Sequence, residues 1–286
     1  MEKIIKLRKI FKQFNLDGYI VPKNNNFFGE YVSASEDNLK YISNFTGSAG
    51  FAVILKNKNL IFVDGRYTAQ ANIQCGKNYK VFTIPKEYPF NIFNHKNLNL
   101  GFDPKLHTEN SLNRLFKNSF IKLKPIDKNL IDLLWKRKKK LNIKPFYIIK
   151  DLDAGARLED KLSNLCNQIK SNKVDYLFTT ASENIAWLLN IRGHDTDYSP
   201  LPNSHAFIEK NKKVILFCNL RKINKYFKLK LNKKIKILDF DQLPDFILNL
   251  LNKKVLIDML TCSVFYKTLI AQNNLVKVKQ DPIYFF

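Results

Sequence analysis

Two stretches of this 286-residue sequence are copies of one pattern: residues 34–47 (ASEDNLKYISNFTG) and residues 181–193 (ASENIAWLLNIRG). The copies differ in length by one residue, and in each a serine and one or two acidic residues precede an apolar run. A serine followed by acids is typical of a helix N-terminus, and a glycine after the apolar run indicates its end. Each stretch therefore predicts a short helix that stops near Gly47 or Gly193.

The segments around these helices also repeat. Residues 52–63 (AVILKNKNLIFV) align without a gap with residues 206–217 (AFIEKNKKVILF), and each reads as a β-hairpin with a polar turn. Before each copy stand a helix and a short strand that opens on aspartate, at residues 17–21 and 175–178. Three elements in the same order predict two related α/β domains, each a mixed sheet flanked by helices.

The limits of these domains follow from composition. We expect a first domain at residues 1–125, a linker at 126–156 and a second domain at 157–286. The linker range holds the basic run at residues 136–140, Pro145 and the segment around Gly155, which suit a connection. A chain of this length is more often two domains than one.

The net charge of the chain is +23, from 48 Lys and Arg against 25 Asp and Glu. Clustered cations can bind nucleic acid or anionic membranes. Here the single dense basic run lies in the expected linker, and the other lysines are scattered. This distribution favours a compositional bias, so neither a nucleic-acid partner nor a membrane partner is expected. A basic nucleic-acid-binding protein or a structural remnant without enzymatic activity remains the alternative function.

The sequence also indicates a cytoplasmic location. No run of eighteen apolar residues suggests a membrane span, and residues 1–14 carry their apolar side chains on one helical face rather than in a signal-peptide core. The four cysteines, Cys75, Cys166, Cys218 and Cys262, stand far apart, so we expect reduced thiols.

Two motifs give these domains a family resemblance. Residues 45–50 (FTGSAG) followed by residues 62–71 (FVDGRYTAQA) resemble paired signatures of the Xaa-Pro aminopeptidases, members of peptidase family M24. Residues 184–195 (NIAWLLNIRGHD) are similar to a segment in the second domain of the same family. The chain thus resembles the two creatinase-like N-terminal domains of a three-domain enzyme.

The resemblance implies a metal-dependent activity for the whole family. Its members remove an N-terminal residue that precedes proline, whose missing N–H and fixed φ exclude the bond from ordinary exopeptidase grooves. Two divalent metals, usually manganese, polarise the carbonyl and supply hydroxide. In the family all metal ligands lie in a third, pita-bread domain, which the resemblance implies is absent here. We therefore expect no catalytic residue, no metal ligand and no cofactor in this chain.

The expected partners follow from the same resemblance. A separately encoded catalytic domain is one, and a peptide substrate is expected only together with that domain. Self-association through the apolar residues 283–286 is the other. The sequence leaves open whether the chain is part of a working enzyme or is inactive alone.

Four residues are predicted to face the catalytic cleft of such an enzyme: Arg66, Tyr67, Arg192 and Asp195. The alternative for the first motif is structural, with Asp64 capping the next helix and Arg66 pairing with a nearby carboxylate.

Two other candidate sites are not favoured, and one segment departs from the family pattern. His194, Asp195 and Asp197 are the best local metal candidates, although a polar loop is the simpler interpretation. Ser48 lacks the pattern of a nucleophile elbow, and we expect its neighbouring glycines to permit a tight turn. Residues 24–28 (NNNFF) stand where the resemblance leads us to expect an acid and a histidine, so neutral and apolar side chains replace those two groups here.

Overall fold

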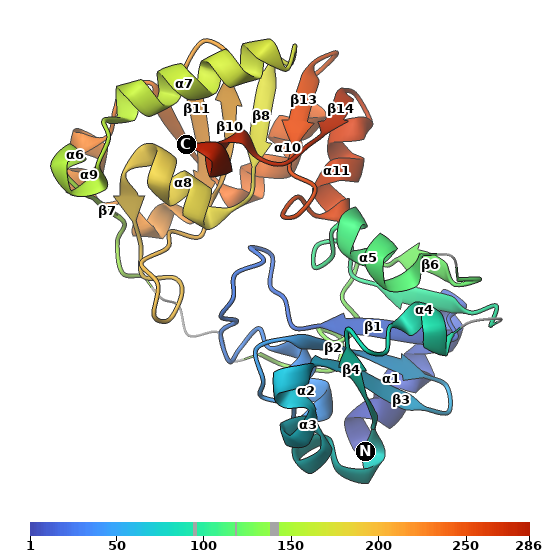
Figure 1. The fold of residues 1–286 in the computed structure, drawn as a ribbon. Helices are drawn as coiled ribbons and strands as arrows, with labels where there is room; N and C mark the ends of the chain where they lie inside the picture. The colour runs from blue at the N-terminus through green and yellow to red at the C-terminus, as the bar shows by residue number, and fades with distance from the viewer. Residues whose placement is uncertain (94–95, 118, 138–142) are drawn as a thin grey trace. The chain divides into compact units, whose positions relative to one another are not determined.

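The computed structural model describes residues 1–93, 96–117, 119–137 and 143–286. The chain forms two compact units (Figure 1). The first comprises residues 1–26 and 30–140, and the second comprises residues 27–29 and 141–286.

The first unit is built on a six-stranded mixed sheet with the order β4-β3-β2-β1-β5-β6. Its strands are β1 (Gly18–Pro22), β2 (Gly50–Leu55), β3 (Asn59–Asp64), β4 (Lys80–Ile84), β5 (Asn99–Phe102) and β6 (Lys122–Pro125). Strand β2 runs antiparallel to both β1 and β3, and the remaining neighbours are parallel. The predicted hairpin is therefore β2–β3.

Helices cover this sheet because their apolar side chains recur at helical spacing. In α1 (Glu2–Phe11), the side chains of Ile4, Leu7 and Phe11 are buried in one core cluster with alternate residues of the central strands. The other helices are α2 (Asn38–Ser43), α3 (Thr68–Cys75), α4 (Pro89–Ile92) and α5 (Glu109–Phe116), with 3-10 turns at Lys12–Phe14, Gly65–Tyr67 and Gly76–Asn78.

The second unit repeats this sheet strand for strand, in the order β12-β11-β10-β8-β13-β14. Its strands are β8 (Tyr176–Thr179), β10 (His205–Glu209), β11 (Val214–Cys218), β12 (Ile235–Asp239), β13 (Lys254–Ile257) and β14 (Leu275–Val278). Strand β10 is antiparallel to β8 and β11, and the other pairs are parallel, as in the first unit. The prediction of two related mixed-sheet domains is confirmed.

Helices lie on both faces of the second sheet (Figure 1). Leu177 and Leu216 face the cluster that contains the buried residues of α7 (Leu158–Ser171) and α8 (Ser182–Leu189). Their neighbours Phe178 and Phe217 belong to a second cluster with α10 (Leu243–Leu248) and α11 (Val264–Ala271). The remaining elements are α6 (Asp151–Ala154), α9 (Lys225–Lys230), the short pair β7 (Tyr147–Ile148) and β9 (Ile191–Arg192), and 3-10 turns at Leu220–Lys222, Phe240–Gln242 and Pro282–Phe285.

The repeated helices end differently from the prediction. Both stop at an asparagine with a left-handed backbone, Asn44 (φ 66°) and Asn190 (φ 53°), not at the later glycines. Asparagine tolerates this conformation, so it can end a helix as glycine does. Asp37, not a serine, caps α2 by accepting a hydrogen bond from the Lys40 amide.

The glycine after the first of these helices is needed for packing. A Cβ on Gly47 would lie 2.3 Å from the ring of Phe45, although the backbone of Gly47 does not have a positive φ. Close approach therefore replaces the predicted tight turn as the reason for this glycine.

Residues 126–156, the predicted linker, contribute side chains to both cores. Ile126, Leu130 and Ile131 are buried in the first unit, and Phe146 is buried in the second. The domain limits given above stay a prediction, and most of the basic run, residues 138–140, lies outside the described residues. Among the helices described, none is long and apolar enough to cross a membrane.

Candidate functional site

The first motif residues lie where β3 leaves the sheet of the first unit. Asp64 caps the 3-10 turn that follows β3: its carboxylate accepts hydrogen bonds from the Arg66 amide at 3.0 Å and from Arg66 Nε at 2.8 Å. These bonds lower the pKa of Asp64 and raise that of Arg66. The Arg66 side chain nevertheless remains 73% exposed. The structural alternative for Asp64 and Arg66 is thus present, and it leaves the guanidinium at the surface.

Tyr67 is held by two contacts within the first unit. Its hydroxyl lies 2.9 Å from Ser48 Oγ, and its ring packs edge-on against Phe45. Ser48 therefore has a hydroxyl partner contributed by the second signature. The FTGSAG and DGRY motifs are therefore neighbours in space, because Tyr67 of the second motif contacts Phe45 and Ser48 of the first.

Arg192 and Asp195 make internal contacts in the second unit. Arg192 donates hydrogen bonds to the carbonyls of Ala186 and Ile191, which closes the C-terminal end of α8. Asp195 forms a buried ion pair with Lys222 and accepts a 2.8 Å hydrogen bond from the Asn203 amide. Burial lowers the pKa of Lys222. Both side chains are thus used in contacts within the second unit, and their place at a cleft stays a prediction.

The metal candidates of the second unit do not form a binding group. Asp195 points to Lys222, while the ring of His194 packs against Tyr147 at 5.5 Å between centroids. Within the described ranges, no three His, Cys, Asp or Glu side chains gather as metal ligands would. The residues present do not fit a dinuclear metal centre, which needs several carboxylates and imidazoles around two ions.

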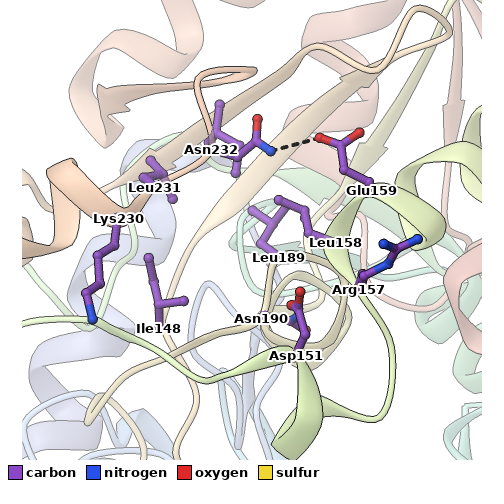
Figure 2. A pocket seen from close by; sticks show the side chains of 11 residues that line it. Ile148, Asp151, Arg157, Leu158, Glu159, Leu189, Asn190, Lys230, Leu231 and Asn232 are labelled. Carbon is purple, nitrogen blue, oxygen red and sulfur yellow. Dashed lines mark hydrogen bonds between the residues drawn. The ribbon is translucent and has the colours of Figure 1, made fainter.

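A cavity of about 340 Å³ lies beside α7 and the end of α8 in the second unit (Figure 2). Two pairs of its polar side chains are hydrogen-bonded to each other. Glu159 accepts from Asn232 at 2.9 Å and from Lys234 at 2.7 Å, and Asn190 donates to Asp151 at 2.9 Å. Because these groups are already paired, we assign no chemistry to this cavity.

Sequence reasoning missed Lys161 and Lys222, two buried lysines of the second unit. Lys161 donates to the Trp187 carbonyl at 2.6 Å and to Asn190 Oδ1 at 2.5 Å, and burial lowers its pKa. The motif around Trp187 and Asn190 could have suggested such a donor. Nothing in the sequence marks Lys222, because it lies far along the chain from Asp195.

Comparison with known proteins identifies the repeated unit. Models of the creatinase/prolidase N-terminal domain match residues 3–133 and, in a second form, residues 137–286. The chain belongs to the creatinase/prolidase N-terminal domain family and contains two copies of this domain. The resemblance drawn from the motifs is confirmed.

The chain is also similar to part of several Xaa-Pro aminopeptidases. A probable Xaa-Pro aminopeptidase P of Coprinopsis cinerea is 30% identical over 86% of this chain and 41% of its own length. Xaa-Pro aminopeptidase 1 of Dictyostelium discoideum is 29% identical over 99% of this chain and 48% of its own length. The chain thus spans less than half the length of these relatives.

A solved structure shows the same arrangement of elements. The X-prolyl aminopeptidase of Caenorhabditis elegans, a cytosolic enzyme with a di-nuclear active site, is 25% identical and matches with a TM-score of 0.86. The match covers 97% of this chain and 50% of the nematode enzyme.

Proposed function

We propose that these 286 residues are the two N-terminal domains of an Xaa-Pro aminopeptidase and act together with a catalytic domain that holds the metals. The observation that carries this proposal is the match of nearly the whole chain to half of a dinuclear X-prolyl aminopeptidase. The internal repeat supports it, because both copies are accounted for by one N-terminal domain family.

In this proposal the chain shapes the enzyme and does not hydrolyse peptides by itself. The catalytic domain belongs to the same polypeptide or to a separate one, and manganese is the metal we expect there. The substrate would be a peptide whose second residue is proline. A bimetal site would polarise its scissile carbonyl, and the domains described here would control access.

The exposed Arg66 is our candidate for a residue that reaches the cleft. It stands beside Tyr67 at the end of β3, with its guanidinium 5.5 Å from the centre of the Tyr67 ring. Arg192 and Asp195 would act indirectly, by ordering residues 191–203 through the contacts with α8 and Lys222.

Reconstitution tests this function. The chain would be mixed with the separately expressed catalytic half of the Dictyostelium relative and manganese, and hydrolysis of an Xaa-Pro tripeptide would be followed. We expect a complex on size exclusion and turnover above that of either part. The absence of both a complex and added turnover would contradict the proposed partnership.

A matched pair of arginines tests the cleft-facing role in that complex. Arg66→Ala is expected to lower turnover, whereas Arg157→Ala should not. Arg157 is the suitable control because it is similarly exposed (71%) and also pairs with a neighbouring aspartate, Asp160. Equal turnover of the two variants would contradict the proposal that Arg66 reaches the cleft.

A further inference from the structure

The first unit has a cavity at the carboxyl edge of its parallel strands. Strands β1, β5 and β6 are parallel neighbours, so their carboxyl ends meet at one edge of the sheet. The residues that follow each strand, 24–26 after β1, Asp103 after β5 and 127–129 after β6, line a cavity of about 430 Å³. This volume is in the range of small-molecule sites.

The strand order makes this edge a place where chain connections diverge. From β1 the chain proceeds to β2 on one side, and after β4 it returns to place β5 on the other side of β1. Connections that leave neighbouring strands in opposite directions open a crevice at their carboxyl ends, where α/β proteins commonly bind ligands. The cavity lies at that crevice.

A buried carboxylate lies among the lining residues. Asp103 is 5% exposed, and its two oxygens accept one hydrogen bond each, from the Lys105 amide and from Asn129 Nδ2, both at 2.8 Å. Each carboxylate oxygen can accept a second hydrogen bond. Burial raises the pKa of Asp103, so a cationic partner would stabilise its charged form.

Acids outnumber bases in the lining, against the strongly positive charge of the chain. The charged side chains are Glu36, Asp103, Asp127, Asp132, Lys105, Lys128 and Arg137. Arg137 is held by Asp132, by Asn38 Oδ1 at 2.7 Å and by the Ser35 carbonyl at 2.9 Å. The two lysines are exposed, whereas Asp103 is buried. A ligand that suits this arrangement carries its cation inward and an acceptor outward.

We propose that this cavity binds a small molecule with a primary ammonium group, of the size of an amino acid or dipeptide, through Asp103. The ammonium would donate to the Asp103 carboxylate, and the carboxylate or carbonyl of the ligand would face Lys105 and Lys128. Leu106 and Leu133 are the aliphatic residues of the lining and suit an aliphatic side chain. The site is distinct from peptide hydrolysis and does not depend on a catalytic domain.

Calorimetry or saturation-transfer NMR on the 286-residue chain tests this proposal. The probes are L-leucine and L-leucyl-L-proline, which separate a free amino acid from a peptide amino end, and N-acetyl-L-leucine, which lacks the ammonium. We expect one or both ammonium probes to bind and the acetylated probe not to bind. Asp103→Asn should weaken binding about tenfold or more, because it removes one side of a desolvated charged contact.

Two further variants keep the test decisive. Asp127→Lys alters an exposed rim residue, so it should fold and weaken binding even if Asp103→Asn is unstable. Asp151→Asn, in the cavity of the second unit, is the matched control and should leave binding unchanged. The proposal is overturned if neither ammonium probe binds, if N-acetyl-L-leucine binds equally well, or if binding responds only to Asp151→Asn.

Discussion

The carboxyl edges of the two sheets use the same backbone device with different side chains. Asp103 after β5 and Asp258 after β13 each accept the amide two residues further on, at 2.8 Å. Asn129 after β6 and Asp281 after β14 do the same at 2.9 Å. The edge is therefore a shared feature of the repeat.

The difference lies in the second side-chain contact. Asn129 donates to Asp103 in the first unit, but Asp281 cannot donate when ionised. Asp281 instead accepts from Thr179 at 2.6 Å and from Asn184 at 2.9 Å, and it is fully buried. An asparagine at this position bridges the edge, whereas an aspartate binds to β8 and α8. In the first unit this edge lines a cavity, and in the second unit Asp281 at the same edge is bound to Thr179 and Asn184.

Asp281→Ala is expected to have the largest effect on this comparison. It leaves the donors of Thr179 and Asn184 and the Ile283 amide without their acceptor, and each unsatisfied buried group costs about 1–3 kcal/mol. We expect a loss of about 4 kcal/mol in the second unit. Urea unfolding followed by Trp187 fluorescence in a Trp135→Phe background measures it, because the chain has only two tryptophans.

Asp281→Asn is the control, because it keeps one carbonyl acceptor and should cost less than the alanine variant. If Asp281→Ala leaves the second unit as stable as in the wild type, the buried contacts of Asp281 do not stabilise this edge of the sheet.

Breaking the buried pair of the second unit comes next. Lys222→Met leaves the Asp195 carboxylate buried without its cation, for which we expect about 3 kcal/mol of destabilisation. The same fluorescence signal reports it. Lys222→Met combined with Asp195→Leu should recover part of this loss, and a double variant that is less stable by the sum of both would contradict the pairing.

The sequence predicted the shared features of the units better than their differences. Asp17 and Asp175 were visible as the openings of equivalent strands, and the structure gives them equivalent bonds. Each accepts from a hairpin lysine and from the first amide of the next parallel strand, Asn99 or Lys254. Short-range patterns of this kind are present in the sequence itself.

Contacts between distant residues could not be predicted in this way. Lys222 reaches Asp195, and Asp281 reaches Thr179, because the folded sheet brings them together. The helix ends at Asn44 and Asn190 were missed because glycine is the commoner signal. The cavity beside Asp103 depends on the order of strands, which periodicity alone does not give.

A matched pair of substitutions tests the shared strand openings. Asp17→Asn and Asp175→Asn should each destabilise their own unit by about 1.5 kcal/mol at neutral pH, through loss of hydrogen bonds to a charged group. The pKa of Asp17 is lowered chiefly by the Asn99 amide, and that of Asp175 chiefly by Lys210. Since the folded pKa lies below the unfolded value, the wild-type advantage is present at neutral pH and declines as pH falls below about 4.

Urea titrations at several pH values check this with the tryptophan of each unit, Trp135 or Trp187. A wild-type advantage that grows on acidification would reverse the assigned sign.

The smallest effect is expected at the exposed motif of the first unit. Asp64→Asn weakens the contact with Arg66 at the surface, where ion pairs contribute little. We expect the thermal midpoint of the purified chain to stay nearly unchanged, in contrast to Lys222→Met. A fall in the midpoint as large as that of Lys222→Met would mean that the Asp64–Arg66 pair stabilises the fold as much as the Asp195–Lys222 pair does.

The most direct measurement is an activity assay of the purified 286-residue chain with added manganese on an Xaa-Pro tripeptide. We predict no turnover above buffer from the chain alone, and turnover when the catalytic domain is added. Turnover by the chain alone that a chelator abolishes would contradict the proposal that the metal centre lies in another domain.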